Sequence, residues 1–134
     1  MHQPGEIPSR LLRAGRSPLA ATLSRCIEEH SQDSGCRESC LLAVSGDHDS
    51  LPLLWLGGAL AQHASQHRFV VAHVNHGLRD EAASEADLVV AHARDAGLEC
   101  IVESIECRGD GNLASIARLR RQDALLQIAR ASGC

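Results

Sequence analysis

The segment 45–50 combines hydroxyl, carboxylate and glycine residues in the pattern of this sequence that is best suited to chemistry. It reads Ser-Gly-Asp-His-Asp-Ser and follows an apolar run, Leu41–Val44. A helical pattern begins directly after it, at Leu51. A strand, a tight turn and a helix start direct backbone N–H groups toward one point, which is how proteins commonly bind phosphate. Asp49 adds a carboxylate of the kind that holds Mg²⁺ beside a polyphosphate.

The same composition also suits a plain polar turn. In that interpretation Asp49 or Ser50 caps the following helix and no ligand is bound, and spacing alone favours this reading because such caps are common. Both interpretations require a buried strand before residue 45 and a helix after residue 50.

The hydrophobic pattern of the chain predicts the elements that must position this segment. Apolar runs at 39–45, 69–74 and 100–105 indicate buried strands, and helical patterns follow each of them. This alternation predicts an α/β fold, a doubly wound parallel sheet with helices on both faces. Ligands in such sheets bind beyond the carboxyl ends of the strands. We therefore expect the polar segments 45–50 and 75–79 to line one crevice.

Three local expectations follow from the pattern. Residues 1–16 show no periodicity and are expected to form a loose terminus. The next helix, which Ser17 and Pro18 introduce, is expected to pack through a face that includes Leu19. Gly57 and Gly58 weaken the helix after the loop, and close packing on the sheet would account for them. We divide the chain into a 1–37 extension with one helix and a 38–134 main domain.

Composition excludes several classes of function. The chain has 134 residues and a formal net charge of −4, which argues against binding nucleic acid by charge alone. All 13 cationic residues are Arg, so a Walker A loop, which needs Lys, is excluded. Six cysteines occur without an apolar secretory leader, so we expect reduced thiols, a cytoplasmic protein and no membrane association. The spacing Cys36-x-x-x-Cys40 has no second pair to complete a zinc site.

The segment 45–50 resembles the PP-loop of N-type ATP pyrophosphatases, whose pattern is Ser-Gly-Gly-x-Asp-Ser after a buried strand. The segment 72–79, Ala-His-Val-Asn-His-Gly-Leu-Arg, is similar to one family of that group, the tRNA(Ile)-lysidine synthetases. Segments 81–87 and 111–121 continue the likeness, which covers roughly residues 38–134. The resemblance implies the Rossmann-like fold of PP-loop ATPases.

The resemblance also implies an activity and a set of site residues. These enzymes adenylate C2 of the wobble cytidine (position 34) of tRNA(Ile) with ATP and Mg²⁺, and L-lysine then displaces AMP. The implied ATP-binding residues are Ser45, Gly46, Asp47, His48, Asp49 and Ser50, with Asp49 also the catalytic residue and the Mg²⁺ ligand. The residues implied near the nucleotide or the tRNA are His73, Asn75, His76, Arg79, Arg118 and Arg121. From the residues alone, His73 is equally a satisfied strand-end residue, and the Arg pair is equally a solvated helix surface.

This sequence departs from the family pattern at several positions. Asp47 replaces the second glycine of the PP-loop, Ala114 replaces a Glu, and Gln122 replaces a Tyr. The family's later His-x-x-Asp-Asp segment is absent from the 134 residues, and we expect a fold that is incomplete at its carboxyl end and belongs to a longer protein. Two alternatives to the ligase remain: a degenerate, non-catalytic nucleotide-binding remnant, or another PP-loop tRNA-modifying enzyme. The sequence makes no prediction of oligomeric state.

Overall fold

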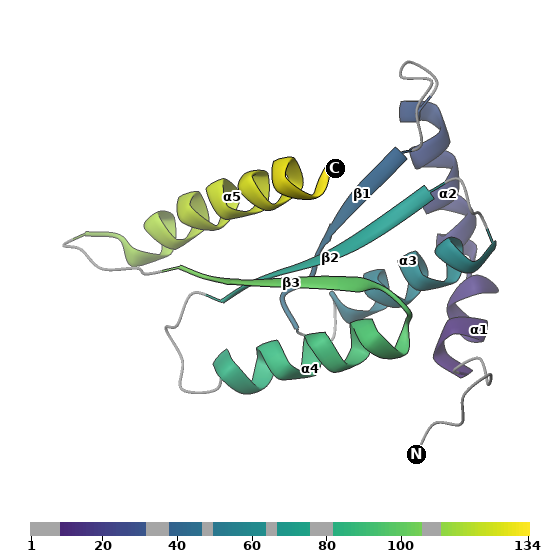
Figure 1. Ribbon diagram of the computed structural model, residues 1–134, viewed down its shortest axis with the longest axis horizontal. Helices are drawn as coiled ribbons and strands as arrows, with labels where there is room; N and C mark the ends of the chain where they lie inside the picture. Colours follow the sequence, from purple (N-terminus) through teal and green to yellow (C-terminus); the bar gives the residue numbers. More distant parts are fainter. Residues whose placement is uncertain (1–8, 32–37, 47–49, 64–66, 76–81, 106–110) are drawn as a thin grey trace.

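The computed structural model of the chain shows a three-stranded parallel sheet with helices on both faces (Figure 1). It describes residues 9–31, 38–46, 50–63, 67–75, 82–105 and 111–134. The elements in chain order are α1 (Ser9–Gly15), α2 (Pro18–Ser31), β1 (Glu38–Ala43), α3 (Leu51–His63), β2 (His67–Asn75), α4 (Ala82–Asp95), β3 (Glu99–Ser104) and α5 (Leu113–Ser132).

The strands lie in the order β1-β2-β3, so β2 is the central strand. Leu42 pairs with Val71 and Val71 pairs with Cys100, in parallel register. Helices α3 and α4 cover one face of the sheet and α5 covers the other (Figure 1). The predicted fold class is therefore confirmed.

Strand β2 is buried on both faces, which explains its apolar sequence. The side chains of Val70 and Val71 point to opposite faces, and both are fully buried. Continuous β-branched runs of this kind are typical of strands covered by helices on either side. The larger core lies between the sheet and the pair α3 and α4, and a smaller one lies beneath α5.

The amino-terminal part differs from the prediction. Residues Ser9–Gly15, expected to be part of a loose terminus, form the helix α1, so two helices precede β1 rather than one. Leu11 is 2% exposed and joins the larger core, which is why this short segment is ordered against α3. In α2 the buried residues are Ala20 and Ile27, whereas Leu19 is 62% exposed. The packing face of α2 therefore excludes Leu19.

Close packing accounts for the two glycines of α3, although they face different neighbours. A Cβ on Gly57 would collide with the Leu42 side chain of β1, as expected for packing on the sheet. A Cβ on Gly58 would lie 2.8 Å from Cδ2 of Leu11 and 3.1 Å from the backbone oxygen of Ala96. Gly58 thus permits α3 to approach α1 and the end of α4.

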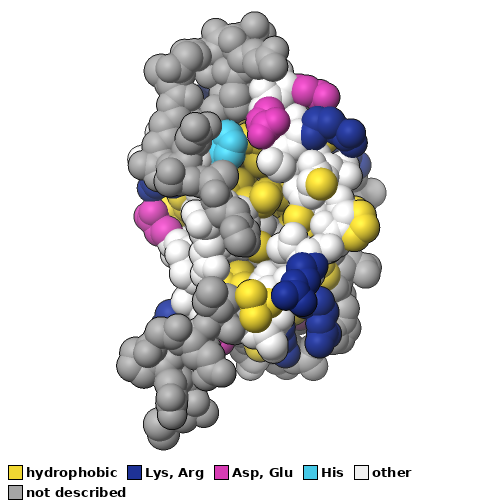
Figure 2. Space-filling model, turned by 90° about the vertical axis from the view of Figure 1, so that its right-hand side faces the viewer, with side chains coloured by type: hydrophobic (Ala, Val, Ile, Leu, Met, Phe, Trp, Pro, Cys, Tyr) yellow, Lys and Arg dark blue, Asp and Glu magenta, His cyan; other side chains and the backbone are white. Residues whose placement is uncertain are grey.

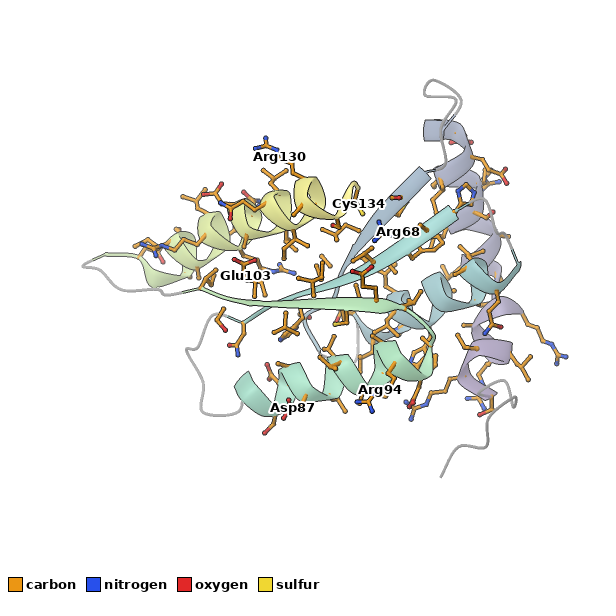
Figure 3. All side chains as sticks on the ribbon, viewed as in Figure 1. Arg68, Asp87, Arg94, Glu103, Arg130 and Cys134 are labelled. Carbon is orange, nitrogen blue, oxygen red and sulfur yellow. The ribbon has the colours of Figure 1, made fainter. Side chains whose placement is uncertain are left out.

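Helix α5 has a capping residue at each end. Asn112 is its N-cap and accepts a hydrogen bond from the Ser115 amide at 3.4 Å, and Gly133 ends it with φ of 76°. Arg68 of β2 donates to the Ser132 carbonyl at 2.6 Å and to Glu99 of β3 at 2.8 Å. Figure 3 shows Arg68 directed toward the carboxyl end of α5. One side chain therefore fastens α5 to two strands.

Arg10, Trp55 and His92 join α1, α3 and α4. The guanidinium of Arg10 lies 5.7 Å from the centroid of the Trp55 ring, and its Nη1 lies 3.2 Å from Nδ1 of His92. The rings of Trp55 and His92 meet edge to face, with centroids 5.7 Å apart. Burial, and then the charge of Arg10, lower the pKa of His92 below its ordinary value of 6.5, against a smaller opposing effect of Asp95.

We predict that Gly58→Ala lowers the free energy of unfolding by about 1 kcal/mol or more, because overpacking costs about 1–3 kcal/mol and exceeds the gain in helix propensity. Urea denaturation measures this change. Gln62→Ala on the same helix is the control: Gln62 is exposed, so this variant should lose no stability. A Gly58→Ala protein as stable as the Gln62→Ala protein would contradict the packing role.

We also predict that His92 makes the fold less stable in acid. Because the pKa of His92 is lowered in the folded protein, the unfolded chain binds the proton more strongly. The contribution of His92 is fully present above pH 6.5 and is lost as the pH falls from there through the folded-state pKa. Urea midpoints between pH 7.5 and pH 5 should therefore fall more steeply in the wild type than in His92→Gln. Parallel profiles would contradict this assignment.

Candidate functional site

The start of the predicted loop folds around the hydroxyl of Ser50. Ser50 Oγ accepts hydrogen bonds from the backbone amides of Ser45 and Gly46, both at 3.1 Å, and it lies 3.0 Å from Oγ of Ser45. Two consecutive amides that converge on one oxygen form the kind of concave donor group that holds anions. The amides of Ser45 and Gly46 therefore both point to a single oxygen.

Gly46 is required by both its conformation and its surroundings. Its φ is +94°, in the region that favours glycine. A Cβ at this position would lie 3.3 Å from Cγ2 of Val89 and 3.7 Å from Cβ of Glu85. Helix α4 therefore packs directly against the loop. Neither Glu85 nor Val89 was predicted as a neighbour of the loop, although α4 follows the strand whose end lies beside it.

His73 is hydrogen-bonded to the residue that precedes the loop. It is 3% exposed, and its Nδ1 lies 2.8 Å from the carbonyl oxygen of Val44. Because a carbonyl can only accept, Nδ1 carries the proton and donates. Val44 also pairs through its amide with Ala72 at 2.9 Å, so β2 holds both polar groups of the last residue before Ser45. For this ring nitrogen the structure supports the interpretation of a satisfied strand-end residue.

The carboxyl ends of β1 and β2 lie side by side, so the structure brings together Ser45, Gly46, Ser50 and His73 and places Asn75 at the neighbouring strand end. The Asn75 carbonyl accepts from the Ile105 amide at 2.8 Å, which connects this edge to β3. The predicted site residues Asp47, His48, Asp49, His76 and Arg79 lie outside the described residues.

Arg118 and Arg121 are exposed on α5, on the face of the sheet opposite α3 and α4. Within the described residues neither side chain makes a hydrogen bond or ion pair, and no contact joins either to the loop. A polar hollow of about 360 Å³ lies between α5 and the end of β3 instead, lined by Glu103, Arg120 and Asp123 among others. Arg120, which was not among the predicted site residues, is the Arg of α5 that lines this hollow.

The described residues lack two features, a cluster of metal-binding side chains and a membrane-spanning helix. They contain no group of three or more His, Cys, Asp or Glu side chains that could together hold a metal ion. In the same part of the chain, no helix has both the length and the apolar character needed to span a membrane.

A parallel sheet whose first strand ends in a loop of converging amides defines an α/β domain with a phosphate-binding type of loop. Residues 19–134 match the family model described as the PP-loop domain. The chain therefore belongs to the PP-loop family.

Individual relatives carry a more particular name. Over 92 residues the chain is 37% identical to the tRNA(Ile)-lysidine synthase of Novosphingobium aromaticivorans, which covers 69% of this chain and 27% of that protein. It is 33% identical over 120 residues to that of Bradyrhizobium sp., covering 87% of this chain and 32% of the relative. It is 35% identical over 103 residues to the tRNA(Ile)-lysidine synthase of Thermus thermophilus, covering 72% of this chain and 19% of that relative. The chain thus spans a third or less of these relatives.

We predict that Gly46→Ala lowers the free energy of unfolding by about 1–3 kcal/mol, because a side chain at positive φ is strained and this one also presses on Val89. Chemical denaturation measures the loss. Gly111→Ala is the matched control, since Gly111 also has positive φ, of 132°, but has open space around its Cβ position. Equal losses in the two variants would show that the contact with α4 contributes nothing.

Proposed function

We propose that this chain is the ATP-binding part of a tRNA(Ile)-lysidine synthase. The reaction proposed for the whole protein is a carbon–nitrogen ligation. ATP adenylates C2 of the wobble cytidine of tRNA(Ile), and L-lysine then displaces AMP. The proposal rests on membership of the PP-loop family and on relatives that carry this name.

The observation that carries the proposal is the pair of amides of Ser45 and Gly46 that converge on Ser50 Oγ. An oxygen of a phosphate chain carries more negative charge than a serine hydroxyl and is the better acceptor for both. ATP would therefore bind with a phosphate oxygen at or beside the position of this hydroxyl. The positive φ of Gly46 keeps its amide turned toward that point.

The residues present fit a Mg²⁺–ATP complex in their chemistry. The two amides and the hydroxyls of Ser45 and Ser50 are neutral groups suited to phosphate oxygens. Asp49 is the proposed Mg²⁺ ligand, because hard cations bound to phosphates take carboxylate oxygens from the protein. Bound there, Mg²⁺ would neutralise charge on the phosphates.

His73 acts in this proposal as a positioning residue. Its hydrogen bond to Val44 fixes the peptide that leads into Ser45, and burial keeps the ring in place. Asn75 ends the same strand, and Asn75, His76 and Arg79 are proposed to lie near the nucleotide or the cytidine. Arg118 and Arg121 are proposed to contact phosphate or RNA, for which their exposure on α5 leaves them accessible.

Asp47 is the residue that opposes binding. It stands where the PP-loop pattern has a second glycine, and its carboxylate carries the same charge as the phosphates. Two like charges about 4 Å apart repel by roughly 4 kcal/mol at an effective dielectric constant near 20. This repulsion favours a second candidate function, that of a non-catalytic remnant that keeps the fold without turnover.

We predict that Asp47→Gly strengthens ATP–Mg²⁺ binding by up to roughly a thousandfold, which is the repulsion expressed as affinity. Isothermal titration measures the dissociation constants of the wild type and the variant. Glu28→Gln is the control, because it also removes one negative charge but from the exposed surface of α2. Saturable binding to the wild type that Asp49→Asn weakens supports the ligase.

ATP–Mg²⁺ binding to the Asp47→Gly variant but not to the wild type supports the remnant. No heat of binding with either the wild type or this variant would contradict an ATP site. AMP release that requires both tRNA(Ile) and L-lysine would identify the complete reaction.

A further inference from the structure

A second concave site lies away from the PP-loop, where α1 and the start of α2 meet α3 and α4. The pocket has a volume of about 490 Å³, which is within the range of roughly 300–1,000 Å³ typical of small-molecule sites. Leu19, Leu51, Leu56 and Leu88 supply much of its wall, and Trp55 adds an aromatic surface. Leu19 and Leu88 are 62% and 45% exposed, so apolar surface remains open to solvent here.

The charged residues that line this pocket are all of one sign. Arg10 and Arg13 both face it, and its described lining contains no carboxylate. The ion pair in the described part of the chain joins Arg68 to Glu99, so neither Arg10 nor Arg13 has an acidic partner there. Figure 2, which faces the side of the molecule with α1 and α2, shows groups of Arg side chains beside exposed hydrophobic side chains.

Arg10 is held in place by neutral groups. The guanidinium carbon of Arg10 lies over the Trp55 ring, 5.7 Å from its centroid, and Nη1 lies 3.2 Å from Nδ1 of His92. A guanidinium has five N–H donors, so this contact leaves donors for a second acceptor. Because cation–π stacking and one neutral acceptor leave the charge uncompensated, Arg10 is an oriented cation at the edge of an apolar pocket.

We propose that this pocket binds an amphipathic organic anion, a carboxylate attached to an apolar body. The carboxylate would pair with Arg10 and Arg13, and the apolar body would lie against the leucines and Trp55. Charge complementarity selects the anion, and the apolar wall selects against inorganic phosphate or a polyphosphate, which would have nothing to bury there. Leu51 and Pro52 also line the pocket and directly follow Ser50, so the ligand would contact the first turn of α3.

Trp55 is the sole tryptophan of the chain and reports on the pocket directly. The experiment is a titration of its fluorescence in the intact chain with decanoate, below the concentration at which decanoate forms micelles, and with uncharged 1-decanol as the matched ligand. We expect a saturable change with decanoate and binding of decanol that is about tenfold weaker or more, since a charge-assisted contact is lost. Equal affinities for the two ligands, no saturable change, or competition by inorganic phosphate would each overturn the proposal.

Variants separate the pocket from the rest of the surface. Arg13→Gln should weaken decanoate binding by about tenfold or more and leave decanol binding unchanged. Arg130→Gln removes the same charge from the exposed surface of α5, where Figure 3 shows it, and should change neither. Leu88→Glu should abolish decanoate binding by repulsion, whereas Leu126→Glu, at a comparably exposed position on α5, should not.

Circular dichroism confirms that each variant is folded before titration. Decanoate affinity that is unchanged in both Arg13→Gln and Leu88→Glu would overturn the site, as would equal losses in Arg130→Gln and Leu126→Glu.

Discussion

The pairing of β2 with both of its neighbours is the constraint on which the rest of this structure depends. Its backbone amides and carbonyls are buried, and only strands on both sides can satisfy them. Its side chains are buried on both faces, so helices must cover the sheet above and below. The same strand then positions the candidate site, because Ala72 and His73 hold both polar groups of Val44, immediately before the loop.

The histidines at the loop and at the second pocket have different roles. At the loop, two neutral backbone amides donate to the Ser50 hydroxyl, and the Nδ1 of His73 donates to a backbone carbonyl. At the pocket, His92 accepts from a cation that has no acidic partner among the described residues. Residue type alone does not distinguish these roles, since a histidine near a strand end and a histidine on a helix read alike in sequence. Burial and the neighbouring group decide between them.

Helix α5 illustrates how the ends of an element can be read from sequence while its contacts cannot. Asn112 and Gly133 act locally, on amides and carbonyls a few residues away, and both are residue types typical of helix caps. The choice among its arginines is not local, because Arg120 rather than Arg118 or Arg121 lines the hollow beside Glu103. That choice depends on how the helix is rotated on the sheet, which Ala124 and Ile128 set by packing against β2 and Arg68 secures at the far end.

The α/β class, the parallel direction of the strands and the place of the loop could be predicted from the sequence, because hydrophobic periodicity, glycines and helix caps act over short distances. It also carried the resemblance that the family match supports. Three features could not be predicted in this way: Ser9–Gly15 is a helix, Leu19 is exposed and lines a pocket, and Glu85 and Val89 lie beside Gly46. Each of these depends on contacts between residues far apart in the chain. The burial of Leu11 against Gly58 stabilises a seven-residue helix that local propensity alone does not.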